Sequence, residues 1–299
     1  MHRRDFFKFG HKGLIPKTDW ELFLHRVQRL TLYDLKIIDS NLNIAYIELR
    51  DNKLIPTLLG ICSDHKVAFL YKKLVDQEAV SGRSSLIFDV IEEAIPISIS
   101  EGECMASFNS LCGDLFRIGY HQFEYVPPNL NLSQWFNNPI FHDERPYYSI
   151  TSGLLDVEAI FSNQLQGTLG AFGLESTSVL NNTLLNKCIP ELFKISQTSE
   201  IVELLDSGFW PNELRFDSLY KKITDINLGR VFLGQKGCYL WANRFHLKAL
   251  PPKKIIPKNK TIFEDDWEFH INPVSLLDLK MLMDPEGIFG YEDEYNENT

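Results

Sequence analysis

The chain has 299 residues, enough for one large or two ordinary domains, and a net charge of −10 that disfavours general binding to nucleic-acid phosphates. It contains no run of about 18 apolar residues, so we expect no membrane insertion. Five cysteines without a CxxC pair favour reduced thiols in a cytoplasmic protein over a disulfide framework or a closed zinc site. We predict no bound metal and no cofactor, and we predict proteins as the partners.

The N-terminal residues 1–17 are predicted to form a basic arm. Residues 2–8 resemble a twin-arginine export signal, but the polar residues 10–13 follow where an apolar stretch would be needed. Thr18 and Glu21 then have the spacing of a capping box, and apolar residues recur behind them at helical intervals. This pattern predicts the first helix, from Asp19 to Leu32.

Residues 18–126 are predicted to form a first α+β domain. Its β-branched and apolar runs, separated by turn residues, indicate an antiparallel meander. The strands are expected at 35–38, 44–49, 54–61, 67–71 and 97–99. Helices are expected at 86–94 and 105–116, the second ending at Gly119, and residues 121–126 are expected to be extended.

Residues 127–150 differ in composition from both neighbours, because they are rich in Pro and Asn. Three large aromatic residues lie within them, namely Trp135, Phe136 and Phe141. A free linker seldom carries such residues. We therefore predict an ordered connection that packs against one or both halves of the chain.

Residues 151–290 are predicted to form a second α+β domain, followed by an acidic tail at 291–299. Expected elements are a bent strand at 167–174, helices at 179–187, 199–205 and from 211, a hairpin at 231–241, a strand at 267–271 and a last helix at 273–283. The fold class predicted from the whole pattern is α+β, with two packed mixed domains. The first would be a helix plus an antiparallel sheet with flanking helices.

Several local patterns could carry chemistry, but each has a simpler structural explanation. They are Gly167-x-x-Gly170-x-x-Gly173, Ser218 with Lys221, Asp39 with Glu48 and Arg50, Cys112 with Asp114 and His121, residues 264–270, and residues 142–144. The glycines lack the order of a phosphate loop, and the Ser-x-x-Lys pair lacks the further motifs that its enzymes need. An arginine cannot replace the lysine base of a nuclease. We therefore predict no catalytic residue from sequence.

The absence of a convincing motif, the many aromatic residues and the segregated charge favour a non-catalytic adaptor or scaffold subunit of a cytosolic assembly. Two alternatives stay open: a small-ligand sensor with a GAF- or PAS-like N-terminal domain, and a hydrolase or nuclease whose site is assembled from distant residues. The predicted partner-binding residues are Arg244, Lys248, Lys253, Lys254, Lys258, Lys260, Trp135, Phe136 and Phe141.

Overall fold

The structure is a computed structural model. It describes residues 16, 18–30, 35–50, 52–74, 83–91, 98–100, 102–142, 149–173, 182–207, 214–220, 225–252 and 273–289. These residues combine helices with one mixed and one antiparallel sheet, which confirms the predicted α+β class. None of the helices in the described ranges is long and apolar enough to cross a membrane.

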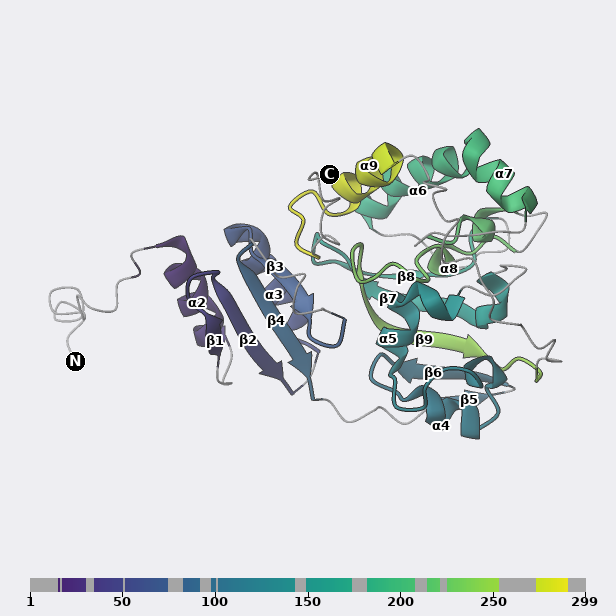
Figure 1. The fold of residues 1–299 in the computed structure, drawn as a ribbon, viewed down its shortest axis with the longest axis horizontal. Helices are drawn as coiled ribbons and strands as arrows, with labels where there is room; N and C mark the ends of the chain where they lie inside the picture. The colour runs from purple at the N-terminus through teal and green to yellow at the C-terminus, as the bar shows by residue number, and fades with distance from the viewer. Residues whose placement is uncertain are drawn as a thin grey trace, which may run out of the picture.

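The N-terminal part is built on a four-stranded sheet with the order β1-β2-β4-β3, called sheet A below (Figure 1). Its elements are α2 (Asp19–Leu30), β1 (Lys36–Asp39), β2 (Ile44–Leu49), α3 (Ile55–His65), β3 (Ala68–Tyr71) and β4 (Ser85–Val90). β1 pairs antiparallel with β2, whereas β2 and β3 both run parallel to β4. The first helix and the strands β1, β2 and β3 lie where the sequence predicts them.

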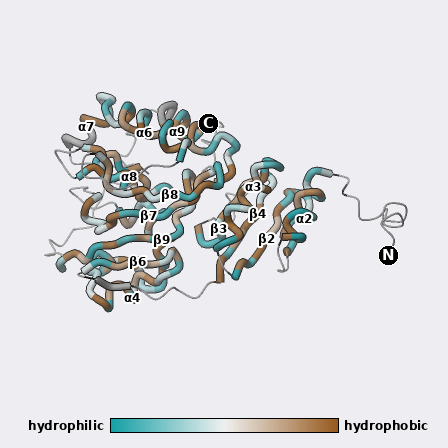
Figure 2. The backbone as a smooth tube through the Cα atoms, turned by 180° about the vertical axis from the view of Figure 1, so that it is seen from behind, coloured by the Kyte–Doolittle hydropathy of each residue, from teal (hydrophilic) through white to brown (hydrophobic). Residues whose placement is uncertain are grey.

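The prediction of an antiparallel meander was wrong, because residues 54–61 form helix α3 and residues 86–94 begin as strand β4. A short apolar run does not by itself distinguish a buried helix from a buried strand. Strands that run parallel to a common neighbour need a crossover connection, and α3 supplies it with Pro56 in its first turn. β4 lies between two parallel partners, and four of its six residues are apolar. Figure 2 shows hydrophobic residues on the strands of sheet A.

The described residues after β4 surround a five-stranded antiparallel sheet, sheet B, with the order β5-β6-β9-β7-β8. Its strands are β5 (Ser98–Ser100), β6 (Glu103–Ser107), β7 (Leu154–Ile160), β8 (Gln166–Leu169) and β9 (Trp241–Lys248). Strands from both sides of residues 127–150 therefore pair within one sheet. The predicted domain boundaries themselves stay a prediction.

Short and long helices surround sheet B (Figure 1). The α-helices are α4 (Cys112–Arg117), α5 (Leu132–Asn137), α6 (Thr183–Ser196), α7 (Ser199–Ser207), α8 (Leu228–Val231) and α9 (Pro273–Met283). The 3-10 helices are η2 (His121–Phe123), η3 (Pro139–His142), η4 (Ser149–Ser152) and η5 (Phe216–Leu219). The predicted helices that correspond to α7 and α9 are confirmed.

Three local predictions in this part were wrong. Residues 105–116 do not form one helix, because β6 ends at Ser107 and α4 begins only at Cys112. Residues 121–126 begin with a 3-10 turn instead of a strand. The predicted hairpin at 231–241 is absent, because Val231 ends α8 and β9 pairs with β6 and β7. Long-range pairing thus determined the partners of β9, and local turn residues did not. The predicted strand at 267–271 lies outside the described residues.

A cluster of aromatic rings joins the two sheets. Trp241 at the start of β9 lies 5.1 Å from the ring of Phe88 and 5.0 Å from that of Tyr71, measured between ring centroids. Phe108 completes the cluster, 5.1 Å from Trp241 and 6.4 Å from Tyr71. The geometry is edge-on or tilted, which aromatic pairs prefer. The cluster positions sheet A against sheet B beside the site described next.

Candidate functional site

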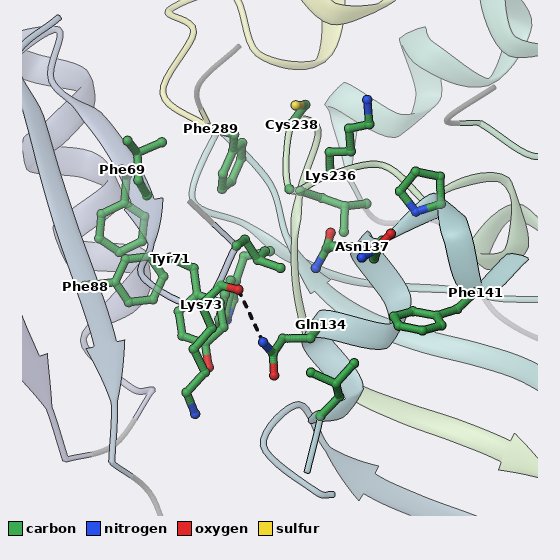
Figure 3. Close-up of a pocket in the computed structure, with 18 residues that line it drawn as sticks. Phe69, Tyr71, Lys73, Phe88, Gln134, Asn137, Phe141, Lys236, Cys238 and Phe289 are labelled. Atoms are coloured by element: carbon green, nitrogen blue, oxygen red, sulfur yellow. Dashed lines mark hydrogen bonds between the residues drawn. The ribbon is translucent and has the colours of Figure 1, made fainter. Parts of the chain in front are cut away.

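A cleft of about 430 Å³ lies between sheet A and the helices and loops next to sheet B. Sheet A contributes residues of β3 and β4, and the other side consists of α5, η3 and the segment 236–241 that leads into β9. Figure 3 shows these side chains facing one another across the opening. The volume lies within the roughly 300–1,000 Å³ typical of small-molecule sites.

Aromatic rings form much of the cleft wall. Phe69 and Phe88 stack face to face, with 4.0 Å between ring centroids and an angle of 9° between planes. Tyr71, Phe141, Trp241 and Phe289 also line the cleft. Rings of this size offer flat apolar surface, which suits a flat ligand.

Helix α5 ties the two walls of the cleft together through its first turn. Asn131 caps the helix by accepting from the backbone N–H of Gln134, and it also donates to the Tyr71 hydroxyl at 3.1 Å. Gln134 donates to the carbonyl of Lys73 at 3.4 Å. These two contacts connect α5 to β3 and to the turn after it, so the cleft has a fixed width at this side.

Two buried polar atoms on the lining residues have no hydrogen-bond partner in the described part of the chain. One is Oδ1 of Asn137, an acceptor, whose side-chain amide group donates instead to Ser133. The other is the indole N–H of Trp241, a donor. Asn137 is 2 % and Trp241 4 % exposed. Each unpaired buried group costs about 1–3 kcal/mol.

The charge of the cleft differs from that of the whole chain. No Asp or Glu is found among the described residues that line it, although the chain is strongly acidic. Lys73 and Lys236 are its charged lining residues. Burial raises the pKa of Tyr71, so its hydroxyl remains protonated at neutral pH. The cleft is therefore mainly apolar and neutral, with positive charge at its borders.

Two charged clusters lie outside the cleft. His246 on β9 bridges Asp156 on β7 at 2.8 Å and Glu103 on β6 at 3.0 Å, which links three neighbouring strands. Arg215 and Asp217 form a buried ion pair at 3.3 Å, and Asp217 also accepts from the backbone of Ser149. No group of three or more His, Cys, Asp or Glu residues in the described part could hold a metal ion.

The predicted partner-binding residues lie in three different environments. Arg244 and Lys248 belong to β9, where Arg244 faces Glu158 at 3.8 Å, so this part of the basic stretch is a strand and no extended arm. Trp135 and Phe136 are 2 % and 0 % exposed, so they are core residues of α5 and offer no surface to a partner.

The remaining members of that set are Phe141, Lys253, Lys254, Lys258 and Lys260. Phe141 lines the cleft, which places it at the candidate site. The four lysines lie outside the described residues. Partner binding by the basic stretch therefore stays a prediction.

The structure describes only some members of the motifs singled out in the sequence. Ser218 is fully buried and donates to the carbonyl of Arg215, while its partner Lys221 lies outside the described residues. Burial raises the pKa of the Cys112 thiol to about 12, which makes it a poor nucleophile. Residues 143–144 and 264–270 also lie outside the described part.

The sequence analysis missed the cleft residues Asn137, Trp241 and Phe289, because they come from distant segments. Only the Asn131/Gln134 capping pattern could have indicated helix α5.

Neither a protein-family model nor a curated protein sequence matches this chain. Solved structures do match. They include an alkyldihydroxyacetonephosphate synthase (10 % identity, TM-score 0.43, 82 % of this chain and 43 % of that chain). A BBE-like 1 protein of Physcomitrella patens matches at 8 % identity with a TM-score of 0.41, over 78 % of this chain and 45 % of that chain. A glucooligosaccharide oxidase from Acremonium strictum, named together with its FAD, matches at 9 % identity with a TM-score of 0.39, over 78 % of this chain and 43 % of that chain.

The chain spans less than half the length of these solved structures. The prediction of a non-catalytic adaptor or scaffold is contradicted by this comparison, because the matched structures include a synthase and an oxidase by name. The adaptor prediction rested on missing motifs, many aromatic residues and segregated charge. Local patterns of this kind cannot reveal a cleft that forms only when distant segments meet.

Proposed function

We propose that the cleft between sheet A and sheet B binds a flat heteroaromatic small molecule, and that the flavin ring system is the ligand class it fits best. The observation that carries this proposal is the aromatic wall of the cleft, which includes the face-to-face rings of Phe69 and Phe88 and has no acidic residue among the described lining residues. A flavin ring is flat, so it can lie against such rings.

The proposed fit is between the cleft and the flavin ring system, and it does not extend to the pyrophosphate of a dinucleotide. A pyrophosphate is usually held by glycine-rich backbone at a helix N-terminus. Among the described lining residues only Gly237 is a glycine, and it lies in the turn before β9. A bound flavin supplies electron or hydride transfer. The residues of this chain would bind and orient its ring and exclude water from its faces.

Titration with riboflavin, FMN and FAD tests the proposal, with flavin fluorescence and calorimetry as readouts. Trp241→Phe keeps an aromatic ring but reduces the apolar surface of the cleft wall, so we expect about tenfold weaker binding, equivalent to about 1.4 kcal/mol. The same change should lower the free energy of unfolding of the ligand-free protein, because the smaller ring leaves a cavity in the buried ring cluster. A thermal melt therefore checks that the variant is folded.

Trp20→Phe is the matched control, since Trp20 lies in α2, stacks on Phe23 and does not line the cleft. It should not change flavin binding. The proposal would be contradicted if none of the three flavins binds at about 1 mM. A dissociation constant of that size corresponds to a binding free energy of roughly −4 kcal/mol. Binding that is insensitive to Trp241→Phe would place the flavin elsewhere.

A further inference from the structure

A short C-terminal segment, residues 284–289, crosses from α9 to sheet A and is called the strap here. It lies along the edge strand β3, where the backbone N–H of Phe69 donates to the carbonyl of Ile288 at 2.6 Å. Arg83 donates two further hydrogen bonds to strap carbonyls, at 2.6 and 2.8 Å. Among the described residues, the strap therefore covers the outer edge of β3 and is fixed there at several points.

The other end of the strap is fixed by a buried carboxylate. Asp284 accepts from the backbone N–H of Ile288 at 2.8 Å and from that of Phe289 at 2.9 Å. It also pairs with Lys280 at 2.7 Å, and Lys280 donates to the carbonyl of Cys238. Cys238 and Phe289 both line the cleft, so this one ion pair positions two of its wall residues.

The strap places the ring of Phe289 at the cleft. Phe289 is 6 % exposed, and Figure 3 shows it between Phe69 on sheet A and Cys238 on the opposite side. Gly287, with φ of +61°, supplies the left-handed turn that brings the chain back, and its N–H donates to the carbonyl of Asp284 at 2.9 Å. The backbone of Phe289 therefore cannot move away from the cleft without breaking its hydrogen bond to Asp284.

We infer that Phe289 is a specificity-determining residue, which limits the cleft to a single flat ring system and excludes a dinucleotide. The inference rests on the proposed function. The strap and Phe289 close one side of the cleft, and the rings of Tyr71, Phe88 and Trp241 close another. The cleft of about 430 Å³ is of a size for one flat ring system, so a ligand with a second nucleotide would have to extend past the wall that includes Phe289.

The test compares the dissociation constants of riboflavin and FAD for the full-length protein and for Phe289→Ala. The unsubstituted protein should bind riboflavin at least about tenfold more tightly than FAD, because the wall rejects added bulk. Phe289→Ala should reduce that ratio to about one, mainly through tighter FAD binding. Phe172→Ala removes a ring that contacts Phe193 outside the cleft, and this control should keep the original ratio.

Arg83→Met provides a second variant, which loosens the strap without substituting a residue that lines the cleft. It should move the ratio in the same direction as Phe289→Ala, and a thermal melt of each variant establishes that it is folded. Equal binding of riboflavin and FAD by the unsubstituted protein would overturn the inference, and so would a ratio that neither variant changes. In both cases flavin binding itself would still stand; if no flavin binds, the proposed function and the inference fall together.

Discussion

His142 illustrates how a single residue can take a role that its sequence neighbours do not suggest. It stands beside Asp143 and Glu144 in the sequence, residue types that can bind a metal but that we interpreted as a solvated acidic face. In the structure its Nε2 lies 2.8 Å from the carbonyl of Trp135, to which it donates. Burial, with a smaller contribution from the Arg215 guanidinium, lowers the pKa of His142 to about 3. The neutral imidazole is therefore a structural donor that holds η3 on α5.

The lowered pKa of His142 predicts a pH dependence of stability. The unfolded chain binds a proton near pH 6.5, whereas the folded chain does so only near pH 3, so protons favour unfolding as the pH falls through that window. The wild-type free energy of unfolding should fall by up to about 1.4 kcal/mol per pH unit more than that of His142→Gln. Urea denaturation at pH 7, 6 and 5 measures the difference, and parallel curves would refute the assignment.

At the scale of elements, the chain was easiest to interpret where a helix carries its own end signals. The Thr18 hydroxyl does cap α2, accepting from the Glu21 backbone, and α9 begins at Pro273 as expected. β4 and α3 were misassigned because their apolar runs fit either structure, and pairing with distant strands decided between them. For the same reason, local sequence patterns could not show that residues of α5 line a cleft.

Gly229 sets the approach of α8 to β8, which gives a prediction at this scale. A Cβ at this position would lie 2.5 Å from the carbonyl oxygen of Leu169, a backbone atom that cannot move aside cheaply. Gly229→Ala should therefore lower the free energy of unfolding by about 1–3 kcal/mol. Gly167→Ala is the control, since its Cβ would meet the ring of Phe161 at 3.2 Å. Equal losses in urea denaturation for both variants would contradict this explanation.

For the whole molecule, the contact between the two sheets is the feature that creates a site. The ring cluster around Trp241, the contacts from α5 to β3 and the strap on the β3 edge all join sheet A to the remainder of the chain. These contacts connect residues 60 to more than 200 positions apart. A substitution that weakens this junction should therefore destabilise both sheets together.

Removal of one ring at the junction tests that coupling. Phe108 is fully buried on the sheet B side and contacts both Tyr71 and Trp241. Phe108→Ala should cost about 3–5 kcal/mol and lower hydrogen-exchange protection in β4 of sheet A as well as in β9. Loss of protection confined to sheet B would mean that the two sheets are energetically independent.

The sequence by itself determined the class of protein: an acidic α+β chain with a capped first helix, a last helix that begins at a proline, and strands where β-branched residues recur. These features depend on composition and on contacts within a few residues, which a linear pattern records. The tertiary structure alone decided the parallel pairing of β4, the burial of Trp135 and Phe136, and the cleft with its unpaired atoms on Asn137 and Trp241. The reason is physical, because burial and hydrogen-bond satisfaction depend on which distant segments meet.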